Sequence, residues 1–257
     1  MELVQKLPHD LRRAIYSVAK RPHFELMQLK RQTMSEEYSF KPFDESKTIF
    51  VHIPKAAGVS ICKSLYGSLA GGHTPISRYQ YVFSKKDFCS YFKFTFVRNP
   101  WDRLFSAYTF LRKGGFNDKD KKWAADNLSP FANFEEFVME WLNAENVREY
   151  LHFIPQTDML FLPGTSVMSI DFVGFFENIE DDFHYIATKM NKAVELPYFN
   201  KTEREESYLY QYNDAMIEVV GDVYRADIET LGYVFDNSTL ANQVAMRSQG
   251  PLTLMQH

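Results

Sequence analysis

Several classes of protein are excluded by what the sequence lacks. Its two cysteines, Cys62 and Cys89, form neither a CxxC pair nor the framework of a disulfide-stapled domain. The seven histidines are scattered, and no HExxH or Cys/His ligand spacing occurs, so no metal site is expected. No apolar run reaches the roughly 18 residues of a membrane-spanning helix, so no membrane partner is expected either.

A targeting signal and a basic excess are also missing. The first 20 residues contain no apolar stretch of the secretory kind. Lysine and arginine number 29 against 33 acidic residues, a net charge of −4, whereas a nucleic-acid-binding protein normally carries a basic excess. We therefore expect a cytoplasmic protein with no nucleic-acid partner, in which a local basic pocket for a small anion remains compatible with the charge. The sequence gives no indication of the oligomeric state.

Aromatic residues, by contrast, are abundant. The 257 residues include 23 Phe, 15 Tyr and 3 Trp, and 45% of the chain is hydrophobic. Such a composition can bury a large core, which excludes disorder for most of the chain. The length fits one large domain or two small ones.

Short β-rich runs alternate with helical periodicity along the middle of the chain. Residues 48–53, 93–97 and 170–173 read as strands, and each is followed by apolar residues at helical spacing. The second helix has a strong start, with Asn99 as N-cap and Pro100 at the first helical position. A last helix is expected from about Asn213 to Leu231, with Gly232 as its stop. This alternation predicts an α/β domain with a central, mostly parallel sheet flanked by helices.

The two ends of the chain differ from this central part. We expect residues 1–46 to form a peripheral helical arm, with a short helix that Pro22 ends. Residues 47–235 form the main domain. Residues 236–257 are predicted to be a loose tail, because no aromatic residue occurs from Asn237 to His257. The charged stretch 114–128 is interpreted as a mobile surface loop.

A possible phosphate-binding loop follows the first strand. Here a lysine, a glycine for close backbone approach and a hydroxyl stand at the start of a helix, a combination that suits a phosphate cradle. A simple turn with a solvated Lys55 is an equally weighted interpretation. The loop is not the G-x-x-x-x-G-K-[ST] motif, since its lysine precedes its only glycine. Its residues are Pro54, Lys55, Ala56, Ala57, Gly58, Val59 and Ser60.

The second strand is followed by a similar junction. Arg98 stands at the strand end, and Arg103 and Ser106 lie within the first two turns of the next helix. Two guanidinium groups and a hydroxyl near a helix N-terminus can hold a second phosphate. Taken alone, however, a structural arginine that pairs with Asp102 or another carboxylate is the favoured interpretation.

Together the two junctions resemble the sulfotransferases that use 3′-phosphoadenosine 5′-phosphosulfate (PAPS), in particular soluble bacterial relatives of the Golgi carbohydrate sulfotransferases. The segments that carry the resemblance are HIPK-x-x-G-x-S at 52–60 and FxFVRNPxxRxxSxY at 94–108, in the family's order, with Gln156, residues 171–178 and residues 196–202. The resemblance implies a P-loop-like three-layer fold and PAPS as sulfuryl donor without a metal. It also implies that loop 54–60 binds the 5′-phosphosulfate and that Arg98 and Ser106 bind the 3′-phosphate.

The sequence departs from the family pattern in two places. Val59 stands where the first loop usually has threonine, which removes one possible hydroxyl contact. The Gly-Arg-Phe-Glu that is common after the third strand reads Gly-Phe-Phe-Glu at 174–177. Neither change removes Lys55, Ser60, Arg98 or Ser106.

Two residues are the candidates for catalysis. By its match to the family loop, Lys55 is expected to stabilise the charge that develops on the leaving nucleotide. His73 is the preferred base for the acceptor, because neutral imidazole accepts a proton near pH 7 and similar enzymes have a histidine between the two cofactor motifs. His152 and Glu177 are alternatives as the base, and a structural role is favoured for His52.

The expected function is transfer of a sulfuryl group from PAPS to a hydroxyl or amine of a carbohydrate or small metabolite. Stretch 114–128 is a candidate for the acceptor entrance, although a merely solvated loop is at least as compatible with it. Two alternatives remain open: a P-loop-like nucleotide kinase or hydrolase, and an inactive nucleotide-binding module. The first lacks the Gly-Lys-Ser/Thr signature and an obvious Mg²⁺ carboxylate.

Overall fold

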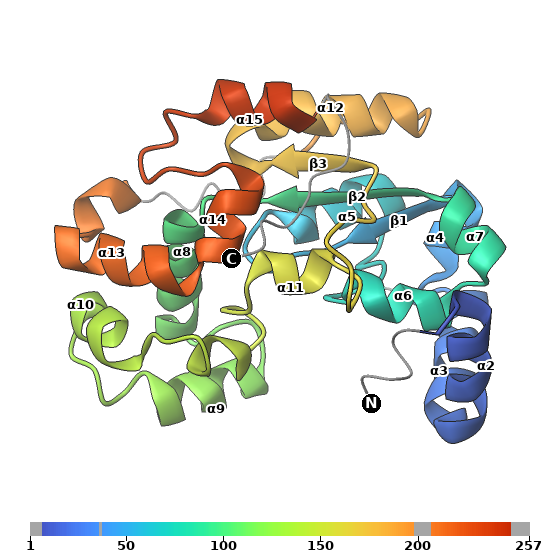
Figure 1. Cartoon of the computed structure of the whole chain (residues 1–257), viewed down its shortest axis with the longest axis horizontal. Coiled ribbons are helices and arrows are strands. Elements are labelled where there is room, and N and C mark those ends of the chain that lie inside the picture. The colour runs from blue at the N-terminus through green and yellow to red at the C-terminus, as the bar shows by residue number, and fades with distance from the viewer. Residues whose placement is uncertain (1–6, 36–37, 198–206, 248–257) are drawn as a thin grey trace.

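The computed structural model describes residues 7–35, 38–197 and 207–247 (Figure 1). At its centre lies a parallel sheet in the order β1-β2-β3, formed by Thr48–Val51, Phe92–Val97 and Phe172–Phe175. Phe50 pairs with Phe94, and Phe96 pairs with Gly174. The three strands were each predicted from the sequence, and the α/β class with a parallel sheet is confirmed.

Buried aromatic and β-branched side chains hold this sheet together. The rings of Phe50 and Phe94 stack at a centroid distance of 4.9 Å, and the Thr95 hydroxyl donates to the Val51 carbonyl. At Gly174 an added Cβ would lie 2.6 Å from the Phe96 ring, so only glycine fits beside that ring. Because all three strands are almost fully buried, their C-terminal ends are fixed points from which the loops start.

Helices cover the sheet on both sides. Figure 1 shows α12 and α15 beside β3, and α6 and α11 on the opposite side of the strands. Together with β1–β3 these helices enclose one hydrophobic core. The helices of this part are α4 (Lys41–Ser46), α5 (Gly58–Tyr66), α6 (Ile76–Val82), α7 (Lys85–Ser90), α11 (Gln156–Leu160), α12 (Ile179–Lys189) and α15 (Leu240–Arg247).

A second core lies away from the sheet and contains no residue of β1–β3. It is centred on α8 and α13 and is rich in aromatic rings, among them Trp101, Phe137 and Phe153. As predicted, α8 starts at Pro100, and the Asn99 side chain accepts a hydrogen bond from the Trp101 N–H. The elements are α8 (Pro100–Arg112), α9 (Asp118–Asn127), α10 (Phe134–Glu136), η1 (Phe137–Trp141), η2 (Asn146–Arg148), η4 (Tyr208–Gln211), α13 (Asp214–Val223) and α14 (Arg225–Leu231). The short helix η3 (Phe176–Asn178) joins β3 to α12.

The N-terminal arm is a pair of helices, α2 (His9–Ala19) and α3 (Arg21–Gln32). The helix expected before Pro22 is present, and Pro22 stands in the first turn of the next one. Polar contacts fix the arm to the domain, because the Arg13 guanidinium donates to the Tyr81 carbonyl and the His9 imidazole lies 3.2 Å from the Phe83 carbonyl. Val18, near the end of α2, is 80% exposed.

The interpretation of stretch 114–128 as a mobile loop is wrong, because most of it forms α9. Asn117 caps this helix through the N–H groups of Lys119 and Asp120, and the side chain of Asp120 is buried. The last helix is interrupted at Tyr224, where α13 ends and α14 begins. Gly232 ends α14 in a left-handed conformation, as expected.

The tail is also corrected for part of its length. Residues Leu240–Arg247 are not loose but form α15, in which Gln243 is buried and donates to the Leu231 carbonyl. The Arg247 guanidinium pairs with Asp182, a carboxylate that is 1% exposed. The aromatic partners in this anchorage belong to β3, where Arg247 lies over the Phe172 ring, and α15 itself contributes Leu240 and Val244 to the core. An absence of aromatic residues in the tail therefore did not reveal it. The rest of the tail, from residue 248, lies outside the described residues.

Candidate active site

The loop after β1 has a strained backbone. Lys55 and Ala57 have φ angles of 69° and 61°, a left-handed conformation that is uncommon for residues with a Cβ. Alternation of such residues with ordinary ones turns successive backbone N–H groups to one side, the arrangement of an anion-binding nest. No side chain caps α5, which starts at Gly58 immediately after this turn. The loop therefore offers backbone donors and a positive helix end to an anion.

Gly58 is required by close packing against His52. An added Cβ at Gly58 would lie 1.9 Å from the His52 ring. His52 is 4% exposed and stacks on Phe50, and burial lowers the pKa of its imidazole well below the ordinary value. These contacts support the structural role that was favoured for His52. Of the other loop residues, Ala56 and Ser60 are buried, whereas Val59 is exposed.

The second junction is joined directly to the first. The Arg98 Nη1 donates to the Lys55 carbonyl at 2.9 Å, and its Nε lies 2.7 Å from Asp102. The guanidinium also stacks on the ring of Phe176 at 4.0 Å. The pairing with Asp102 that the sequence favoured is thus present, but it coexists with a bond that brings the two candidate phosphate loops together.

The residues of the later motifs hold the second junction in place. The amide of Gln156, which is fully buried, bonds to both the N–H and the carbonyl of Arg98. Glu177 accepts the Asn99 N–H and the Tyr233 hydroxyl, and burial raises the pKa of its carboxyl. These contacts assign Glu177 a bracing role rather than that of the base. Of motif 196–202, residues 198–202 lie outside the described residues.

The other two predicted residues of this junction differ in their surroundings. Ser106 is half-buried on α8, two turns from the helix start. Arg103 is 2% exposed and donates to the backbone carbonyls of Pro54, His152 and Ile154. Arg103 therefore ties the first loop to segment 152–154, and its hydrogen bonds are structural.

His73 lies beside the first loop. Its Nδ1 is 3.2 Å from the His52 carbonyl, and because a carbonyl oxygen only accepts, this nitrogen carries the proton and Nε2 keeps its lone pair. Burial lowers the pKa of His73 below 6.5, partly offset by the hydrogen bond to His52, so the neutral form prevails at pH 7. The Nε2 lone pair of His73 is therefore available to accept a proton.

Near His73 lie three residues from the helical part of the molecule: Phe110, Asp120 and His152. The Lys55 ammonium is 3.7 Å from the centre of the Phe110 ring, which in turn is 5.1 Å from the His152 ring. The His73 and His152 rings are 6.4 Å apart. The Asp120 carboxylate accepts from Tyr150 and lies 3.2 Å from the Nε2 of His152. The site thus lies where the two cores meet.

The sequence reasoning missed Phe110 and Asp120. Phe110 lies three turns into α8 and is one of 41 aromatic residues, so nothing in the sequence distinguishes it. Asp120 had one signal, the Gly114-Gly115 pair before a capped helix start. At Gly115 an added Cβ would lie 2.1 Å from the Cβ of Asp120, so glycine is required beside this carboxylate.

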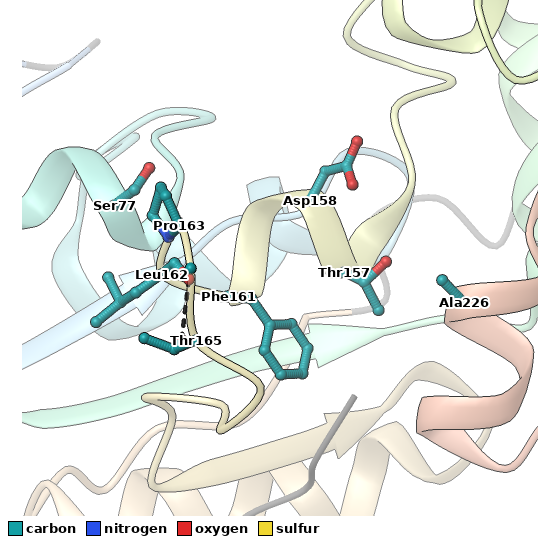
Figure 2. Close-up of a pocket in the computed structure, with 9 residues that line it drawn as sticks. Ser77, Thr157, Asp158, Phe161, Leu162, Pro163, Thr165 and Ala226 are labelled. Carbon is teal, nitrogen blue, oxygen red and sulfur yellow. Dashed lines mark hydrogen bonds between the residues drawn. The ribbon is translucent and has the colours of Figure 1, made fainter. Parts of the chain in front are cut away.

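A surface pocket of about 340 Å³ lies elsewhere, beside α11 (Figure 2). It contains none of the predicted site residues. Within the described residues, no group of His, Cys, Asp or Glu side chains could hold a metal ion. No helix in this part of the chain is long and apolar enough to cross a membrane. The pocket is lined by Ser77, Thr157, Asp158, Phe161, Leu162, Pro163, Gly164, Thr165 and Ala226.

Comparison with known proteins defines the class to which this site belongs. The profile of the sulfotransferase family matches residues 38–234, so the chain belongs to the sulfotransferase family. Carbohydrate sulfotransferase 14 of Danio rerio is 24% identical over 93% of this chain and 74% of its own length. An uncharacterised protein of Archaeoglobus fulgidus is 31% identical over 48% of this chain and 88% of its own length. No solved structure matches significantly. The chain is therefore a sulfotransferase, as the two junction motifs predicted.

Proposed function

We propose that the protein transfers a sulfuryl group from PAPS to a hydroxyl or amine of a carbohydrate or small metabolite. The observation that carries this proposal is the bond between Arg98 and the Lys55 carbonyl, which holds two cationic strand-to-helix junctions side by side. PAPS carries phosphate groups on the 3′ and 5′ positions of its ribose, so two adjacent anion sites match it better than one. The similarity to a carbohydrate sulfotransferase supports a carbohydrate acceptor.

The residues present fit this donor. The nest at Lys55 and Ala57 and the uncapped start of α5 would hold the 5′-phosphosulfate, with the Ser60 hydroxyl at the same helix end. Arg98 and Ser106 would hold the 3′-phosphate. When bound, PAPS supplies a sulfuryl group attached to a phosphate leaving group. The family calls for no metal in this chemistry.

Lys55 would act on the leaving side. Its ammonium lies against the face of the Phe110 ring, in a half-buried position. A cation held in such a place stabilises negative charge that develops during bond breaking more than it stabilises the ground state. Lys55 thereby lowers the barrier rather than only binding the nucleotide.

His73 would act on the acceptor side. Its Nε2 lone pair, fixed by the Nδ1 hydrogen bond to His52, accepts the proton of the attacking hydroxyl. The boundaries of the catalytic unit, residues 47–235, and a cytoplasmic location belong to the same proposal. Free thiols at Cys62 and Cys89 fit a reducing compartment.

One pair of measurements tests the proposal. Adenosine 3′,5′-bisphosphate should raise the melting temperature strongly, and Mg-ATP should raise it little, because only the former carries the 3′-phosphate. Transfer of labelled sulfate from PAPS to a panel of glycosides and small alcohols should follow. Stabilisation by Mg-ATP alone would favour a kinase or hydrolase, and nucleotide binding without transfer would favour an inactive binding module.

A further inference from the structure

His152 is the best-supported residue at this site to which the proposed function gives no role. It is 8% exposed, and its Nε2 lies 3.2 Å from the Asp120 carboxylate. Asp120 also accepts the Tyr150 hydroxyl and the Phe116 N–H, and these bonds lower the pKa of its carboxyl although burial acts to raise it. The ionised carboxylate only accepts, so Nε2 carries the proton and Nδ1 keeps the lone pair.

That Nδ1 lone pair is buried and has no hydrogen-bond partner among the described residues. Such an orphaned acceptor is costly in a folded protein and calls for an explanation. Burial lowers the pKa of His152 to about 4, so near pH 7 the ring offers a hydrogen-bond acceptor and does not readily take up a proton. A donor that reaches this nitrogen when the acceptor binds makes its hydrogen bond in a medium of low dielectric.

The position of His152 indicates which donor this is. Its ring lies edge-on to that of His73, with the ring centres 6.4 Å apart, and Phe110 and the Lys55 ammonium lie alongside. Two hydroxyl oxygens on adjacent sugar carbons lie about one hydrogen-bond length apart, roughly 2.8 Å. With one further hydrogen bond on each side, the three contacts measure about 8.4 Å end to end. A hydroxyl pair that lies alongside the two rings, rather than between them, can therefore reach both.

We propose that His152, oriented by Asp120, binds a second hydroxyl of the acceptor next to the one that reacts at His73. The inference rests on the proposed function and narrows its acceptor to compounds with neighbouring hydroxyl groups, such as sugars. The reacting hydroxyl oxygen forms the new bond to sulfur and gives its proton to His73. The bond from sulfur to the phosphate oxygen breaks, and the phosphate keeps the electron pair. The second hydroxyl stays protonated on His152.

The test compares methyl glycosides that carry neighbouring hydroxyls with analogues in which one hydroxyl of the pair is replaced by hydrogen. For the wild type, kcat/KM should be roughly 10–100-fold higher with the intact glycoside, as expected for one buried hydrogen bond. His152→Phe should remove this preference by raising KM for the intact glycoside, and leave the deoxy analogue within about threefold. The affinity for adenosine 3′,5′-bisphosphate should not change. His184→Phe, on the exposed face of α12, is the matched control.

Asp120→Asn provides a second variant, which keeps the His152 imidazole and changes only its partner. The new amide can donate to Nε2, which moves the proton to Nδ1 and turns the acceptor into a donor. The preference for the intact glycoside should fall as in His152→Phe. Equal losses with both acceptors in either folded variant, or a wild type that uses simple alcohols as well as glycosides, would overturn the inference. Failure of the proposed function differs from both, since the wild type would then transfer no sulfate at all.

Discussion

In the first junction the turn between β1 and α5 contains two left-handed residues, and no side chain caps the helix. In the second, between β2 and α8, the Asn99 side chain caps the helix, and Gln156 occupies both backbone groups of Arg98. The first junction therefore leaves backbone donors for a ligand, whereas the second uses its polar groups to keep one arginine in place. Both carry a cation at a strand end, yet they should respond differently to mutation.

The largest effect is expected at the first junction. Lys55→Ala should lower turnover by roughly 10²–10³-fold, the scale of losing one charge partner of the transition state. Stability should hardly change, since Lys55 is half-buried and its backbone bond to Arg98 does not involve its side chain. Turnover with saturating PAPS measures the effect, and Lys63→Ala on the exposed side of α5 is the control. Near-normal turnover of Lys55→Ala would remove its proposed role.

At the second junction the expected loss is smaller and concerns binding. Arg98→Ala should weaken adenosine 3′,5′-bisphosphate by about 10–100-fold, since a charge-assisted hydrogen bond contributes roughly 1.5–3 kcal/mol. AMP, which lacks the 3′-phosphate, should lose little affinity. Calorimetry with both ligands decides the matter. Equal losses would mean that Arg98, through Asp102 and the Lys55 carbonyl, only braces the loops.

The junction after β3 offers a reference in which bracing is the whole function. Asp182 accepts the Phe175 N–H at the strand end and pairs with Arg247 of α15. Arg247→Ala should lower the free energy of unfolding by about 1.5–3 kcal/mol, because it removes a charged partner from a buried carboxylate. Arg225→Ala breaks an exposed pair with Asp222 and should cost at most about 1 kcal/mol. Urea unfolding compares the two variants, and equal costs would show that α15 is weakly docked.

The parts that the sequence predicted are those with local signals. Strands β1–β3, the Asn99 cap and the Gly232 stop each depend on neighbouring residues, and so do the two junction motifs. The contacts that were missed join distant segments. Asp120 meets Tyr150 and His152, 30 and 32 residues further along the chain, and no local pattern encodes such pairs. Helix α9 was missed because its charged sequence resembles a solvated loop.

The smallest expected effect is that of pH above 7 on kcat/KM. It reports on His73, which lies beside the first junction, and not on Arg98 of the second. Burial lowers the pKa of His73 below 6.5, so its neutral, proton-accepting form already prevails at pH 7. The profile of kcat/KM should therefore vary by less than about twofold between pH 7 and 8.5. Below the pKa of His73 the base becomes protonated, and kcat/KM should fall by about tenfold per pH unit. The nucleotide affinity of Arg98→Ala and wild type, measured over the same range, should keep a constant ratio, because arginine does not titrate there. An acid limb centred above pH 7 would contradict the assignment, since a buried neutral histidine next to the Lys55 cation has no reason to hold its proton that tightly.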